Sequence, residues 1–205
     1  MGRPRTNDAA VRERLVACAT EMFATRPQES VTVRALATAA GTSTAAVYTL
    51  FQGKDGLIRA VRDRAVGGLF QELAAVPPSD AALDDLYELA DAYRRWGREH
   101  RNLYMVLFGG AQSFDPSGRV GDRDPVQPLV AAIERAVVDH TLAGDTTMIA
   151  VSLWVALHGL VTLELTGGLD DTAAETAFRS TVHAVLRGWA TPATFPGLRR
   201  SNLPP

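Results

Sequence analysis

The chain has 205 residues, 46% of them hydrophobic, and carries a net charge of −2 at pH 7. This length suffices for one large domain or two small ones with their own cores, and the single cysteine excludes an intramolecular disulfide. Residues 1–60 carry eight Lys and Arg against five Asp and Glu, whereas the remainder carries thirteen against eighteen. A basic N-terminal part on an acidic body is expected where only one end binds nucleic acid.

Apolar residues recur with helical period in almost every segment, and the first of these segments ends before Pro27. Leu15 and Cys18 lie on its apolar face, and Asn7 or Asp8 is the predicted N-cap. Cys18 has apolar neighbours, so we interpret it as a buried structural thiol. The alternative is a redox sensor, which requires an exposed, electropositive setting.

Two short helices are predicted at 33–40 and 44–50, with Gly41 between them. Gly41 can adopt the positive φ that ends a helix sharply, and Thr32 and Ser43 are suitable N-caps. Two short helices joined by a glycine turn are typical of a helix-turn-helix, which places its second helix in the major groove of DNA. The alternative is a plain helical hairpin inside an α-helical domain.

Six further helices complete the prediction. They are expected at about 54–75, from Ser79 or Asp80 through Trp96, at 103–108, at about 126–142, at 145–166 and at 172–190. Residues 111–128 are a predicted loop, and residues 191–205 a predicted disordered tail. The predicted fold class is all-α, with about nine helices in a helix-turn-helix domain at 1–56 and a second domain at 57–190.

The longest apolar run, residues 148–161, is interrupted by Ser152 and His158 and is shorter than a bilayer span. The first residues contain no apolar core of a signal peptide. We therefore expect a cytoplasmic protein without a membrane partner.

The second short helix and its neighbours supply candidate DNA contacts. Tyr48 can reach a phosphate, and Lys54 starts the next helix, where the local amides also favour an anion. Arg3 and Arg5 on a flexible arm can add phosphate or minor-groove contacts. Base reading falls to small side chains whose hydroxyl and methyl groups discriminate modestly. These candidates are Thr42, Thr44, Ala45, Ala46 and Thr49.

Several segments together carry a resemblance to a known family. Residues 12–23 read Arg-Glu-Arg-Leu-Val-Ala-Cys-Ala-Thr-Glu-Met-Phe, residues 31–41 read Val-Thr-Val-Arg-Ala-Leu-Ala-Thr-Ala-Ala-Gly, and Ser43, Val47, Tyr48, Phe51, Lys54, Asp55, Leu57 and Ile58 follow. These residues closely resemble the DNA-binding domain of the TetR family of bacterial transcriptional regulators.

The resemblance implies an all-α homodimer, usually a repressor, with a ligand pocket in a variable C-terminal domain. By position it implies phosphate contacts from Thr32, Ser43, Tyr48 and Lys54. It implies that bases face Thr44, Ala45 and Thr49. The family usually has larger polar or aromatic residues at the positions of Thr49 and Leu50. These departures leave open the operator identity and the aromatic or histidine phosphate contact often made at the position of Leu50.

The segment containing Trp154, His158 and Gly159 resembles a Trp-His-Gly signature of one C-terminal subgroup of the family. Two apolar stripes predict a four-helix interface between two protomers. They are Ile149, Leu153, Leu157 and Leu160 on one helix, and Val182, Val185, Leu186 and Trp189 on the next. The alternative is that both stripes pack inside one subunit.

Aromatic residues concentrate in the middle of the chain, which favours an apolar or aromatic ligand. The candidate ligand-binding residues are Tyr87, Tyr93, Trp96, Tyr104, Met105, Phe108, Trp154 and His158, with His100 as a further polar partner. The alternative is that they form an ordinary core, with His158 a core histidine. No His or Cys spacing suits a metal, so we expect neither a metal site nor a cofactor.

Taken together, these features predict a homodimeric repressor that a small molecule releases from a palindromic double-stranded DNA operator. The alternative is a regulator of the same fold without such a ligand, controlled by a protein partner or acting as an activator. A catalytic protein is a third interpretation. The chain has no Gly-rich phosphate loop and no nucleophile motif, and Asp84, Asp85 and Glu88 fit a solvated face, so we predict that it is not an enzyme.

Overall fold

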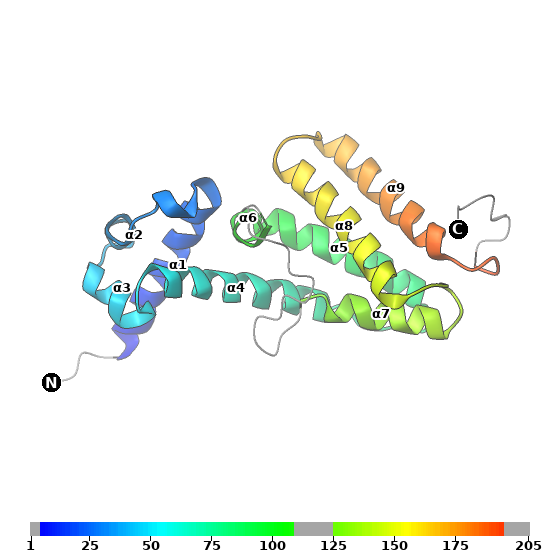
Figure 1. Cartoon of the computed structure of the whole chain (residues 1–205), viewed down its shortest axis with the longest axis horizontal. Coiled ribbons are helices and arrows are strands. Elements are labelled where there is room, and N and C mark those ends of the chain that lie inside the picture. Colours follow the sequence, from blue (N-terminus) through cyan, green and yellow to red (C-terminus); the bar gives the residue numbers. More distant parts are fainter. Residues whose placement is uncertain (1–4, 109–124, 195–205) are drawn as a thin grey trace. The chain divides into compact units, whose positions relative to one another are not determined.

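The computed structural model describes residues 5–108 and 125–194, with the side chains of residues 5–7 left out. Within these ranges nine α-helices and one 3-10 helix are present, and the predicted all-α fold is confirmed (Figure 1). The helices are α1 Arg5–Thr25, η1 Gln28–Ser30, α2 Val33–Ala39, α3 Thr44–Phe51, α4 Lys54–Ala74, α5 Ala82–Glu99, α6 Arg101–Phe108, α7 Gln127–Val138, α8 Thr146–Leu165 and α9 Asp171–Trp189. Most of the predicted loop at 111–128 and of the predicted tail lies outside the described residues.

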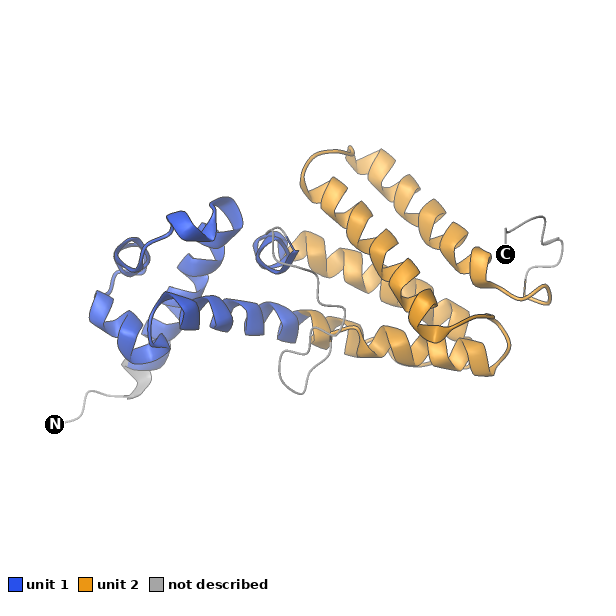
Figure 2. Ribbon diagram, viewed as in Figure 1, with its two compact units in different colours: residues 1–68, 100–123 blue, residues 69–99, 124–205 orange. Residues whose placement is uncertain are grey.

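The chain divides into two compact units, which Figure 2 colours separately. Unit 1 comprises residues 1–68 and 100–123, and unit 2 comprises residues 69–99 and 124–205. The division falls inside α4, and α6 belongs to unit 1. The predicted domain boundary, between residues 56 and 57, also lies inside α4 but close to its start, twelve residues before the observed division.

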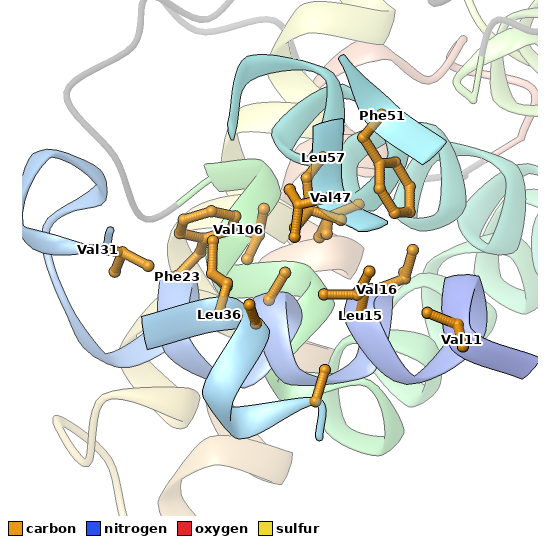
Figure 3. Packing of buried hydrophobic residues seen from close by; sticks show 14 residues of the cluster. Val11, Leu15, Val16, Phe23, Val31, Leu36, Val47, Phe51, Leu57 and Val106 are labelled. Atoms are coloured by element: carbon orange, nitrogen blue, oxygen red, sulfur yellow. The ribbon is translucent and has the colours of Figure 1, made fainter. Parts of the chain in front are cut away.

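The core of unit 1 is built from one apolar face of each of its helices. Leu15 of α1, Leu36 of α2, Val47 of α3 and Leu57 of α4 are fully buried, and Val106 of α6 joins them (Figure 3). Short helices such as α2 and α3 are marginal alone, so this shared core is what holds them in place.

A glycine turn joins α2 to α3, as predicted. Gly41 has φ +62°, and its N–H donates to the carbonyl of Thr38 over 3.1 Å. The N–H of Thr42 donates to the carbonyl of Ala37 over 2.9 Å. These two bonds form a Schellman motif, which satisfies the last carbonyls of α2 and lets α3 start at once in a new direction.

The start of α1 differs from the prediction. The helix begins at Arg5, so Asn7 and Asp8 lie inside its first turn and neither is the N-cap. An acidic residue in the first turn of a helix interacts favourably with the helix dipole. Asp8 therefore indicated the correct turn of α1, but it is not the N-cap. Arg5 therefore belongs to a helix rather than to a flexible arm, and Arg3 lies outside the described residues.

The end of α7 also differs, since the helix stops at Val138 rather than near Leu142. His140 has φ +58°, and the N–H of Leu142 donates to the carbonyl of Ala136 over 2.9 Å. Leu142 is nonetheless fully buried, and it forms an isolated antiparallel bridge with Ala190. Its burial outside the helix explains why apolar periodicity placed the helix end too late.

Unit 2 packs α8 against α5, α7 and α9 around large buried side chains. Trp96, Ile133, Leu153 and Phe178 are at most 2% exposed. Ile149 and Leu157 are buried as well, so this stripe of α8 packs inside the subunit rather than against a second protomer.

The opposite side of α8 is also apolar. Met148, Val155 and Leu163 are between 49% and 54% exposed, and Gly159 lies among them at helical spacing. By length and composition alone α8 could cross a membrane, since it has 20 residues and a mean hydropathy of 1.8 over 18 of them; it extends beyond the run 148–161 at both ends. Its packing in unit 2 buries one side as the core helix of a domain would, and leaves the other side uncovered in one chain.

An ion cluster joins α5, α8 and α9 inside unit 2. Arg94, with a side chain only 8% exposed, donates from Nε and Nη2 to both carboxylate oxygens of Glu164 over 2.8 and 2.9 Å. Its Nη1 donates to Glu175, and its guanidinium lies 5.1 Å from the ring centroid of Phe178. Hydrogen bonds from Arg179 and Arg94 lower the pKa of Glu175 to about 2, so this carboxylate is charged at neutral pH.

Gly144 sits in the turn before α8, where an added side chain would not fit. Its φ is +149°, and a Cβ atom there would lie 2.8 Å from two ring carbons of Trp189. We expect Gly144→Ala to lower the free energy of unfolding by about 1–3 kcal/mol, because it combines backbone strain with overlap on the indole. Urea denaturation of the two proteins measures the difference, and equal midpoints would contradict the prediction.

Candidate nucleic-acid interface

The N-termini of α2 and α3 are capped by the hydroxyls that the sequence indicated. Thr32 Oγ1 accepts a hydrogen bond from the N–H of Ala35, and Ser43 Oγ accepts one from the N–H of Ala46, both over 3.2 Å. The predicted caps are confirmed. Both residues are exposed, and each hydroxyl keeps its own proton for donation to a further acceptor.

The two sides of α3 differ in exposure. Val47 and Phe51 are buried in the core of unit 1, as Figure 3 shows. The opposite side presents small polar and apolar groups around one large aromatic ring. Its exposed residues are Thr44, Ala45, Tyr48 and Thr49. A short helix with a buried anchor face and an uncovered polar face has the form of a helix that enters a DNA groove.

Tyr48 is the most prominent side chain on this face, at 59% exposed. Gly53, with φ +116°, lies against it, since a Cβ atom built there would be 3.5 Å from the tyrosine ring. The absence of a side chain at Gly53 lets the ring rest on the backbone after α3. The ring is supported along one side, which restricts where its hydroxyl can be presented.

Several residues near the exposed face of α3 are less accessible for DNA contact than the sequence suggested. Ala46 and Leu50 are partly buried and pack against the core of unit 1, which turns them away from the exposed face. Lys54 Nζ donates to the carbonyl of Gln28 over 2.9 Å and thereby ties η1 to the start of α4. An ammonium group has three protons, so this bond leaves Lys54 two donors for a phosphate. Thr42 is half-buried in the turn.

Two arginines of α1 reach the C-terminal ends of the helix pair. Arg12 Nη1 donates to the carbonyl of Leu50 over 3.4 Å, and Arg14 Nε donates to the carbonyl of Ala40 over 3.2 Å. Both residues belong to the segment 12–23 that carries the family resemblance, but the sequence assigned them no role. A backbone carbonyl as partner leaves no signal in the sequence that could have identified them.

The predicted ligand residues are divided between the two units. Tyr104, Met105 and Phe108 lie on α6 in unit 1, where the rings of Tyr104 and Phe108 meet edge to face at 4.9 Å. The others lie in unit 2, on two helices. These are Tyr87, Tyr93 and Trp96 on α5, and Trp154 and His158 on α8.

Tyr93, Trp96 and Trp154 are buried in unit 2. Trp154 and His158 stack with ring centroids 4.9 Å apart, and burial lowers the pKa of His158, which is neutral at pH 7. The hydroxyl of Tyr87 and Nδ1 of His183 are 2.9 Å apart and hydrogen-bonded. Three of the predicted ligand residues in unit 2 are therefore in contact with another side chain: Trp154 and His158 with each other, and Tyr87 with His183.

A cavity of about 200 Å³ lies elsewhere in unit 2, among the end of α4, α5 and α7. Its wall includes Leu89, Pro128 and an ion pair in which Arg135 Nη2 donates to Asp85 over 2.5 Å. None of the eight predicted ligand residues lines it. Asp85 is 4% exposed, so its assignment to a solvated face is wrong. Burial raises the pKa of Asp85, but hydrogen bonds from Ser79 and Arg135 outweigh this, and the net pKa lies below the usual value.

Sequence comparison matches two parts of the chain to known families. Residues 15–61 match the family described as bacterial regulatory proteins, tetR family, and residues 86–185 match the tetracyclin repressor-like C-terminal domain. An HTH-type transcriptional regulator of Mycobacterium tuberculosis, itself uncharacterised, is 29% identical over 210 residues, which cover 96% of this chain and 93% of that protein.

Solved structures share the fold. PfmR of Thermus thermophilus, a TetR family transcriptional regulator, has a TM-score of 0.69 at 22% identity, over 85% of this chain and 97% of PfmR. A bacterial regulatory protein of the tetR family from Rhodococcus RHA1 has a TM-score of 0.70 at 21% identity, over 88% and 97% of the two chains.

The two family matches span more than two thirds of the chain, in the order in which the helix-turn-helix and the helical body occur. Members of this family are transcription factors rather than enzymes. The chain belongs to the TetR family of bacterial regulatory proteins and is a DNA-binding transcriptional regulator.

Proposed function

We propose that this regulator is a cytoplasmic homodimeric repressor that binds a palindromic operator through α3 and leaves it when a small molecule binds unit 2. The exposed face of α3, anchored from behind by Val47 and Phe51, is the observation that carries the proposal. Thr32, Ser43, Tyr48 and Lys54 contact phosphates. The base-reading residues are Thr42, Thr44, Ala45 and Thr49.

Small hydroxyl and methyl groups make weak direct contacts with bases, so much of the specificity comes from DNA shape and from phosphate contacts. We expect Tyr48→Phe to weaken operator binding about fivefold, because one hydroxyl–phosphate hydrogen bond is lost while the ring keeps its support on Gly53. The loss should be similar for all duplex sequences, since a phosphate carries no base identity. Fluorescence anisotropy on two unrelated duplexes measures it; a loss confined to one duplex would contradict the assigned contact.

The dimer is supported by the outer side of α8 and α9. Val155 and Leu163 leave an apolar surface uncovered, and a Cβ atom at Gly159 of α8 or Gly188 of α9 would meet nothing within 4 Å. Glycine in a helix interior is unfavourable unless something requires the space. A second protomer approaching closely at these positions supplies that requirement, and the two-fold symmetry matches a palindrome with half-sites about 34–36 Å apart.

A ligand acts by its different affinity for the two states of the protein. The cavity beside Leu89 supports a small, largely apolar effector in unit 2. The surroundings of the buried Trp96 of α5 and Trp154 of α8 are a second candidate place for the same class of ligand. The Trp154, His158 and Gly159 segment of α8 supports assignment to the Trp-His-Gly subgroup.

Selection of bound sequences from random duplex DNA by the purified full-length chain tests the function. We expect enrichment of a palindrome, with an affinity that falls steeply with salt as phosphate contacts require. No enrichment would contradict operator binding. A thermal-shift screen of small molecules then separates the two regulatory alternatives, because a ligand that binds the folded state raises the melting temperature. The ligand-controlled alternative also requires that the same molecule weaken operator binding.

A further inference from the structure

We propose that Arg12 and Arg14 of α1 are positioning residues for DNA recognition, which hold the ends of α3 and α2 in the arrangement that reads the operator. The inference rests on the proposed function of α3 as the DNA-reading helix. It adds two residues of α1 to the proposed contacts of α2, α3 and α4 and assigns them a role in specificity.

Arg12 contacts the end of α3 in two ways. Its Nη1 donates to the carbonyl of Leu50 over 3.4 Å, and its guanidinium carbon lies 4.7 Å from the ring centroid of Phe51. Leu50 and Phe51 are the last two residues of α3. A cation is favourable both at a helix C-terminus and over an aromatic ring. The Arg12 side chain therefore holds both the last backbone turn of α3 and the buried Phe51 ring.

Arg14 makes the corresponding contact with α2. Its Nε donates to the carbonyl of Ala40, the C-cap of that helix, over 3.2 Å. Neither α2 nor α3 has a basic residue in its own last turn. The positive charge that the C-terminal ends of both helices favour is therefore supplied by α1.

The position of the end of α3 matters because Tyr48 and Thr49 project from its last turns. The helix has only eight residues and depends on its surroundings for order. Leu50 packs against the core and leaves its carbonyl to Arg12. If this contact is lost, a larger fraction of molecules holds the reading face in a different orientation, and the apparent operator affinity falls by the same fraction.

The competing role for an exposed arginine next to DNA is a direct phosphate contact, and the two roles give different measurements. Loss of a phosphate contact weakens binding to every duplex and reduces the slope of log affinity against log salt by about 0.9. Loss of positioning weakens binding to the selected operator much more than binding to a scrambled duplex, because base reading depends on the orientation of α3, and it leaves the slope unchanged because no charged contact is removed.

The experiment uses the full-length chain with the operator recovered by selection and a scrambled duplex of equal length. For Arg12→Gln and Arg14→Gln we expect about fivefold to tenfold weaker operator binding, scrambled binding within about twofold, and the wild-type salt slope. Arg12→Lys should recover part of the loss, because lysine restores the charge but not the planar stacking. Arg64→Gln is the matched control: it breaks an exposed ion pair of 2.8 Å between α4 and Glu13 of α1, and should leave both affinities unchanged.

Unchanged operator binding in both variants would overturn the proposal. Equal losses on the two duplexes with a reduced salt slope would also overturn it and make these arginines phosphate contacts. Circular dichroism establishes folding, and if Arg12→Gln melts below the assay temperature, Arg12→Lys and Arg14→Gln decide the question. A wild-type chain that enriches no sequence would refute the proposed function at the first step, before any variant is compared.

Discussion

Replacing Arg94 by methionine is expected to lower the free energy of unfolding of the chain by about 3 kcal/mol, the largest stability change that we predict for one side chain. The methionine fills much of the volume but leaves Glu164 without its main partner and leaves Glu175 to Arg179. Glu164 is the critical one, since its side chain is only 8% exposed and loses both hydrogen bonds from Arg94. A single contact of 3.4 Å from the half-exposed Arg98 remains.

The expected loss of unfolding free energy is large because Glu164 is buried, not because the cluster contains several ions. An uncompensated charge in a site of low dielectric keeps its desolvation cost when its partner is removed. Arg95 offers the comparison within the same helix. It bonds Glu72 over 2.6 Å, but its side chain is 52% exposed, so Arg95→Met should cost less than about 1 kcal/mol.

Urea denaturation followed by tryptophan fluorescence measures this difference, because Trp96, Trp154 and Trp189 all belong to unit 2. The double variant Arg94→Met with Glu164→Leu should recover part of the loss, since it removes the orphaned charge as well. A single variant within about 1 kcal/mol of the wild type would mean that Glu164 is solvated or paired by Arg98 alone.

Local signals in the sequence were sufficient for most of the helices. Thr32, Gly41 and Ser43 fix the two short helices because capping and positive φ involve only residues within one turn. The exposed face of α3 follows from the same periodicity that buries Val47 and Phe51. These features require no knowledge of distant contacts.

Three errors in the sequence analysis share a cause, which is a partner far away in the chain. Asp85 resembled a solvated carboxylate because Arg135 is 50 residues away. Leu142 resembled the last turn of a helix because its bridge to Ala190 cannot be read locally. The stripe of Leu153 on α8 was assigned to an interface with a second protomer but packs inside its own subunit, since periodicity shows that a face is buried but not by what.

Val155→Glu is expected to convert the protein into a monomer and to weaken binding to a palindromic operator by at least about a hundredfold. Val155 is 54% exposed in one chain, so the substitution should change the stability of a single subunit by less than about 0.5 kcal/mol. In a two-fold interface the same charge is buried twice, which is strongly unfavourable. Without the dimer, each half-site is bound by a separate molecule and the gain from linkage is lost.

Analytical ultracentrifugation at micromolar concentration measures the dimer, and anisotropy with a full palindrome and with a single half-site measures the consequence. The full palindrome should lose affinity while the half-site affinity stays near the wild-type value. Val138→Glu is the control, because this valine at the end of α7 is 74% exposed and the substitution is chemically identical. A Val155→Glu protein that stays dimeric would place the interface on another surface.

Gly159→Leu distinguishes a dimer contact from an effect on the single subunit, because the two predict different changes in subunit stability and in operator affinity. A Cβ atom at Gly159 meets nothing within 4 Å in one chain, and leucine is preferred over glycine inside a helix by up to about 1 kcal/mol. If α8 faced only solvent, the variant would therefore be more stable and bind the operator as the wild type does. If a second α8 approaches there, the leucine forces the helices apart, so the monomer gains stability while the dimer and its operator binding are lost. Opposite changes in helix stability and operator affinity in one variant are a result that only a close interface at Gly159 produces.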